Sequence, residues 1–162
     1  MAGERILAVD DDAGILRVFT SVLESEGYKV ETASNGANAI KLAKTSFFNL
    51  ALLDIMLPDM QGTELLTQLQ KVAPRMIKIM MTGFPSIENT VKSLNLHADA
   101  FLTKPFRPDE LLAVINEQLS KRREEESLGP AELFSDLHDI RARQLREKSK
   151  EGHSAGGDGT SR

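Results

Sequence analysis

The chain has 162 residues, 41% of them hydrophobic, with no cysteine and a formal net charge of −4 at pH 7. This length suits one domain, or one domain with a tail, and the lack of cysteine excludes a disulfide framework and thiolate chemistry. The acidic balance excludes the broad basic field of a nucleic-acid-binding surface. No apolar run reaches the ~20 residues of a membrane span, and the first residues lack the apolar core of a signal peptide. We therefore expect a cytoplasmic protein.

Short apolar runs alternate with amphipathic stretches up to about residue 122. The first pair is a predicted strand at 5–10 and a predicted helix at 13–26, in which Ile15, Phe19 and Val22 recur at helical spacing. Four similar pairs follow in chain order: 28–33 with 36–46, 50–54 with 62–72, 76–81 with 86–96, and 99–103 with 108–121. Five such pairs in a row predict an α/β fold with a parallel sheet and helices on both of its faces.

Two doubly wound strand orders fit this alternation, the dinucleotide-binding one and the flavodoxin-like one. The first predicted turn carries no glycine-rich phosphate loop. This absence favours a flavodoxin-like, five-stranded sheet in the order 2-1-3-4-5, with five helices.

The composition changes after residue 122, so we place the limit of the main domain there, at 1–122. A charged run that ends in Gly-Pro predicts a linker at 123–130. An apolar stripe predicts a helix at 131–150, for which a role in partner binding or dimerisation stays open. Residues 151–162 are small and polar and are predicted to be a disordered tail.

Polar residues stand where the predicted strands end: Asp10 and Asp11 after the first, Asp54 after the third, Thr82 after the fourth and Lys104 after the fifth. Sites in open parallel sheets form at these carboxyl ends, where the strand order reverses. Three carboxylates in a small cleft cannot all ionise without a cation, and oxygen ligands suit a hard divalent ion such as Mg²⁺. A carboxylate can also accept a phosphoryl group, which a lysine and a hydroxyl group would stabilise.

Four stretches carry a resemblance to a known family: "ILAVDDDAGIL", "LALLDIMLPDMQGTELL", "IKIMMTG" and "AFLTKPF". On these, residues 4–121 resemble the response-regulator receiver domain of two-component signalling, in its stand-alone, chemotaxis-regulator-like form. The resemblance implies that Asp54 is the phosphoacceptor. It also implies that Mg²⁺ is held by Asp10, Asp11, Asp54 and the main-chain carbonyl of Met56.

The same resemblance implies a switch at the rim of the site. Thr82 would be the switch hydroxyl, Phe101 the switch aromatic and Lys104 the phosphate-binding lysine. The bond before Pro105 is similar to one that is cis in the family.

The function implied is that of a phosphorelay phosphoacceptor. A histidine kinase or phosphotransfer protein would supply the phosphoryl group, and the protein's own chemistry would be limited to Mg²⁺-dependent self-phosphorylation and self-dephosphorylation. A protein-interaction face made by the fourth helix, the fifth strand and the fifth helix would then switch. About forty residues follow the domain, so we expect no DNA-binding output domain. We expect a downstream protein partner at that face or at the tail and no nucleic-acid or membrane partner, and a homodimer stays open.

Three positions call for separate predictions. His97 stands where the family usually has glycine, and we expect a positive φ there. Asp12 is predicted to cap the following helix rather than to bind the cation. Phe84, two residues after Thr82, is expected to crowd the attacking water and to lengthen the life of the phosphoryl group.

Two alternatives remain open from the sequence. A phosphohydrolase with an aspartyl nucleophile at the end of the first strand would use Asp10, although Gly14 stands where such enzymes have threonine or valine and no cap domain is available. A phosphorylation-independent interaction module would keep the fold alone.

Overall fold

Strands and helices alternate along the chain in the computed structural model, which describes residues 3–83, 86, 92–93 and 95–128. The elements are β1 (Arg5–Val9), α1 (Ala13–Ser25), β2 (Lys29–Ala33), α2 (Gly36–Thr45), β3 (Leu50–Asp54), α3 (Gly62–Val72), β4 (Ile77–Thr82), β5 (Ala100–Thr103) and α5 (Pro108–Ser127). All strand pairs are parallel, in the order β2-β1-β3-β4-β5. The predicted flavodoxin-like fold is confirmed.

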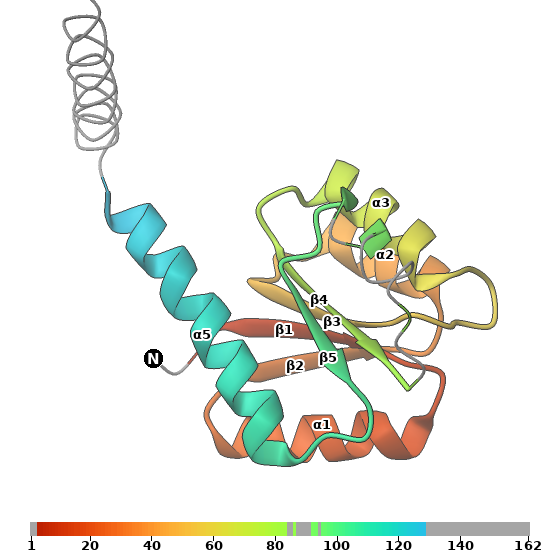
Figure 1. The fold of residues 1–162 in the computed structure, drawn as a ribbon, viewed down its shortest axis with the longest axis horizontal. Coiled ribbons are helices and arrows are strands. Elements are labelled where there is room, and N and C mark those ends of the chain that lie inside the picture. The colour runs from red at the N-terminus through yellow and green to blue at the C-terminus, as the bar shows by residue number, and fades with distance from the viewer. Residues whose placement is uncertain (1–2, 84–85, 87–91, 94, 129–162) are drawn as a thin grey trace, which may run out of the picture. The chain divides into compact units, whose positions relative to one another are not determined.

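Alternate residues of the sheet enter two hydrophobic cores, one on each face. Ile6 and Ala8 of β1 belong to a core that includes residues of α1 and α5, whereas Leu7 and Val9 belong to one that includes residues of α2 and α3. Figure 1 shows α1 and α5 together on one side of the strands and α2 and α3 together on the other. Because successive side chains of a strand point to opposite faces, this arrangement explains the nearly unbroken apolar runs of the central strands.

The C-terminal part of the fold differs from the prediction in one respect. Helix α5 does not end at residue 121 but continues to Ser127, through part of the stretch predicted as a linker. Its charged run is rich in arginine and glutamate, both good helix formers, and the first helix breaker is Gly129. The prediction that this helix ends at residue 121 was therefore wrong.

Several predicted elements lie partly or wholly outside the described residues. Of the predicted helix at 86–96, Ser86, Lys92, Ser93, Asn95 and Leu96 are described, and the middle three of these are helical. The predicted helix at 131–150 and the tail at 151–162 are not described. The chain divides into two compact units, Met1–Lys121 and Arg122–Arg162, and the site described below lies in the first. None of the described helices is both long and apolar enough to cross a membrane.

His97 has a φ of 72°, which confirms the predicted left-handed conformation. The amide of Ala98 donates to the carbonyl of Ser93 at 3.0 Å, as in a helix end that a left-handed residue closes. Histidine occupies this conformation at a cost that glycine does not have, because its Cβ crowds the backbone.

We expect His97→Gly to stabilise the protein. Relief of the crowding should exceed the entropy cost of glycine and raise the free energy of unfolding by about 0.5–1 kcal/mol. Urea unfolding followed by circular dichroism would measure the change, with His97→Ala as the control that keeps a Cβ. Equal stability of the glycine variant and the wild type would contradict this reading.

Candidate functional site

The ends of β1 and β3 bring three aspartates together. Val9 and Leu53 are partners in the parallel pairing of these strands, so the residues that follow them emerge at the same edge of the sheet. One carboxylate oxygen from each of Asp10, Asp11 and Asp54 lies within 4.8 Å of the others. Asp10 is only 1% exposed and Asp54 8%, whereas Asp11 is open to solvent. The structure thus assembles the cluster that the strand order predicts.

Lys104 reaches this cluster from the end of β5. Its Nζ donates to Asp10 Oδ2 at 2.6 Å and lies 3.5 Å from Asp54 Oδ2. The pKa of Asp54 is nevertheless raised, first because the carboxyl is buried and second because of the negative charge of Asp10. Lys104 and the Met56 amide oppose this rise without cancelling it. The site therefore has more negative charge than one lysine offsets, and its all-oxygen donor set fits a hard divalent cation.

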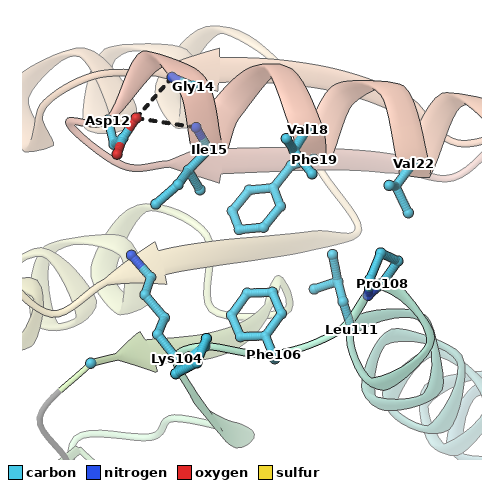
Figure 2. Close-up of a pocket in the computed structure, with 12 residues that line it drawn as sticks. Asp12, Gly14, Ile15, Val18, Phe19, Val22, Lys104, Phe106, Pro108 and Leu111 are labelled. Atoms are coloured by element: carbon cyan, nitrogen blue, oxygen red, sulfur yellow. Dashed lines mark hydrogen bonds between the residues drawn. The ribbon is translucent and has the colours of Figure 1, made fainter.

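Asp12 has a separate task from its two neighbours. Its Oδ1 accepts from the amides of Gly14 at 2.8 Å and Ile15 at 3.2 Å, which confirms it as the N-cap of α1 (Figure 2). Its own amide donates to Asp10 Oδ1 at 2.9 Å. Since Lys104 occupies the other oxygen of Asp10, both oxygens of this buried carboxylate are engaged. The sequence signalled the cap but not this second bond.

The remaining predicted site residues lie around the cluster. The Met56 amide donates to Asp54 Oδ1 at 3.4 Å, and its side chain is 70% exposed. Thr82 ends β4 as a buried residue, and its carbonyl accepts from the Lys104 amide at 2.6 Å. Phe101 lies outside the polar cluster, half-buried against the core on the α2 and α3 side. The peptide bond between Lys104 and Pro105 is cis.

Phe84, the residue expected to crowd the attacking water, lies outside the described residues.

A tight turn follows Asp54, and Gly62 closes it. The amide of Gly62 donates to the carbonyl of Ile55 at 2.7 Å. A Cβ on Gly62 would lie 2.6 Å from Ile55 Cα and would also press on the carbonyl oxygen of Asp54. Sequence reasoning used this glycine only as the start of a helix, because its close backbone neighbours lie seven and eight residues earlier in the chain.

An apolar groove of about 700 Å³ runs beside the site, between α1 and the segment that joins β5 to α5. Figure 2 shows Phe19 and Phe106 facing each other across it, with Lys104 near the end where Asp12 caps α1. The two rings stack with their centroids 5.8 Å apart.

Known proteins resemble this chain in both sequence and structure. Residues 6–116 match the family described as the response regulator receiver domain. The chain is 36% identical over 148 residues to YkoG, an uncharacterized transcriptional regulatory protein of Bacillus subtilis, and this match spans 90% of the chain and 65% of YkoG.

Two solved structures share the fold. A CheY-like receiver domain protein from Methanospirillum hungatei is 49% identical with a TM-score of 0.75, over 76% of this chain and 99% of that one. A response regulator protein from Burkholderia pseudomallei, with a phosphorylated aspartic acid, a calcium ion and citrate, is 30% identical with a TM-score of 0.67, over 77% of this chain and 74% of that one. With the family match covering more than half of its length, the chain belongs to the response regulator receiver domain family.

Proposed function

We propose that Asp54 accepts a phosphoryl group from a phosphohistidine of a histidine kinase or phosphotransfer protein. The observation that carries the proposal is the position of Asp54 at the end of β3, with Asp10 and Asp11 beside it and Lys104 Nζ 3.5 Å from its Oδ2. Receiver domains are signalling phosphoacceptors rather than enzymes that turn over a separate substrate. The phosphorylated aspartic acid in the similar Burkholderia pseudomallei protein supports the same chemistry here.

In the transfer, an oxygen of the Asp54 carboxylate forms a bond to phosphorus while the bond between phosphorus and the donor nitrogen breaks. Lys104 lies close enough to pair with the negative phosphoryl oxygens once it leaves Asp10. Asp10, Asp11 and Asp54, together with the carbonyl of Met56, would hold Mg²⁺. The bound ion would add positive charge that stabilises the negative phosphoryl oxygens.

We further propose that Thr82, Lys104 and Phe101 change position together after the transfer. Two observations support this: the Lys104 amide donates to the Thr82 carbonyl, and Phe101, three residues before Lys104 in the chain, is half-buried. The movement would shift the protein toward a second conformation, in which the face formed by the 86–96 segment, β5 and α5 is changed. A downstream protein would bind that face or the C-terminal tail. The phosphodonor would contact the groove beside Lys104, since it must bring its phosphohistidine to Asp54.

YkoG is named a transcriptional regulatory protein, and the chain spans 65% of its length. The expectation that no DNA-binding domain follows, like that of no nucleic-acid partner, therefore stays a prediction.

Intact-mass measurement tests the proposal directly. After incubation with acetyl phosphate and MgCl₂, we expect the wild-type protein to gain the mass of one phosphoryl group, because the small donor can enter the exposed side of the cluster. Chelation of Mg²⁺ with EDTA should prevent the gain. A wild-type protein that stays unmodified in the presence of Mg²⁺ would contradict the proposed function.

A further inference from the structure

The loop between β3 and α3 is fastened to a helix that takes no direct part in the site. The two carboxylate oxygens of Asp59 accept from the first amides of α2, Oδ1 from Gly36 at 2.8 Å and Oδ2 from Ala37 at 2.9 Å. These two bonds hold the pKa of Asp59 below its usual range, so the carboxylate is charged at neutral pH. The helix has its own cap in Asn35, whose Oδ1 accepts from Asn38 at 2.8 Å.

A second contact reinforces this attachment. The side chain of Met60 packs directly on the backbone of Gly36, where a Cβ would lie 2.6 Å from Met60 Cγ and 2.8 Å from Met60 Cε. Asp59 and Met60 together therefore fix the tip of the loop to the first turn of α2. Any residue larger than glycine at position 36 would require the Met60 side chain to move.

The loop is also closed on itself, so its tip and its base move together. Met56 and Gln61 form an isolated antiparallel bridge, and the Leu57 amide donates to the carbonyl of Met60 at 3.3 Å. At the base, Gly62 is bonded to Ile55 at 2.7 Å. These backbone contacts connect the tip of the loop, at Asp59 and Met60, to Met56.

Met56 depends on this loop for its position. Its side chain is 70% exposed and adds little burial, and its amide makes only a long bond of 3.4 Å to Asp54. We propose that Asp59 is a positioning residue for the cation site, which holds the loop against α2 so that the Met56 carbonyl stays in place for Mg²⁺. This inference rests on the proposed function, because the role of Met56 as a ligand belongs to that function.

Calorimetric titration with MgCl₂ tests the inference on the full chain. Asp59→Asn removes the charge and turns one acceptor into a donor, so one bond to α2 is lost. We expect about 10-fold weaker Mg²⁺ binding, the scale of effect seen when a group that orients a metal ligand is lost. In the acetyl phosphate reaction, the Mg²⁺ concentration for half-maximal rate should rise by the same factor. The rate at saturating Mg²⁺ should return to near the wild-type value.

Two matched variants separate positioning from other effects. Asn35→Ala weakens the same helix end by removing its own cap, so it should lower the melting temperature but leave Mg²⁺ binding unchanged. Asp109→Asn removes the same charge from the first turn of α5 and should also leave it unchanged. Should Asp59→Asn fail to fold, Asp59→Glu keeps the charge on a longer side chain and should weaken Mg²⁺ binding less severely.

The possible outcomes are distinct. Mg²⁺ binding by Asp59→Asn equal to that of the wild type would overturn the inference alone, and so would an equal loss in Asp109→Asn. A wild-type protein that gives no Mg²⁺ binding isotherm would overturn the proposed function and this inference with it.

Discussion

Asp54→Asn should abolish uptake of the phosphoryl group. The amide lacks the charged oxygen that must attack phosphorus. Of the three clustered carboxylates, only that of Asp54 stands at the end of β3 with an oxygen 3.5 Å from Lys104 Nζ. We expect a rate at least about 1,000-fold below that of the wild type, as is typical when a nucleophile is removed. Intact-mass measurement over time with acetyl phosphate and MgCl₂ would show it.

The loss should not come from unfolding. Burial raises the pKa of the Asp54 carboxyl above its usual value. Ionisation of this carboxyl at neutral pH therefore lowers the stability of the folded state relative to the unfolded state. The neutral amide removes this cost, and Asp54→Asn should therefore be at least as stable as the wild type in the absence of Mg²⁺. The gain in the free energy of unfolding should be largest at neutral pH. It should fade as the pH drops toward the usual carboxyl range, because Asp54 is then protonated in both the folded and the unfolded wild type.

Asp12→Asn is the matched control, since it removes the same charge next to the cluster. Asparagine also caps helices well, so this variant should be phosphorylated like the wild type. Asp10→Asn tests the phosphohydrolase alternative, in which Asp10 would be the nucleophile. Undiminished phosphorylation of Asp54→Asn, or a covalent phosphoryl group on Asp10, would contradict the assignment of Asp54.

Gly62→Ala should destabilise the protein by about 3 kcal/mol, the upper end of the usual cost of overpacking. The added Cβ would lie 2.6 Å from Ile55 Cα and press on the carbonyl oxygen of Asp54, and neither backbone atom can turn away as a side chain would. Urea unfolding followed by circular dichroism would measure the loss. Because the displaced residue is the phosphoacceptor itself, the folded fraction should also take up the phosphoryl group more slowly.

Gly83→Ala is the control for this variant, because an added Cβ there would have no non-neighbouring atom of the described residues within 4 Å. It should change the free energy of unfolding by no more than a few tenths of a kcal/mol. If Gly62→Ala were as stable as Gly83→Ala, the backbone of the turn after Asp54 would move aside for the added Cβ more easily than its contacts indicate.

Much of the site could be predicted because its residues stand at strand ends. Once the apolar runs set the strands, the parallel order requires Asp10 and Asp54 to meet at one edge of the sheet. The resemblance to receiver domains then supplied the expected roles of Met56 and Phe101, neither of which has a local signal of its own. The end of α5 was predicted too early, because the change from apolar to charged residues was given more weight than the helix propensity of that charged run.

Features that depend on near neighbours in the chain could be predicted from the local sequence. Apolar periodicity fixed the alternation of strands and helices, since it records which face of each element is buried. Asp12 caps amides two and three residues ahead, so its role was visible locally. The positive φ of His97 was instead predicted from the glycine that the family usually has at that place.

Contacts between distant segments became visible only in the folded chain. Lys104 meets Asp10 across 94 residues, and Asp59 bonds to α2 across 22 and 23 residues. The backbone of Gly62 lies against that of Ile55, and Phe106 stacks on Phe19. Each of these contacts depends on how the sheet and its helices pack. The residues next to a lysine, aspartate or glycine in the sequence do not indicate whether it has such a distant partner. The charge balance of the site and the attachment of its loop therefore become visible only in the folded chain.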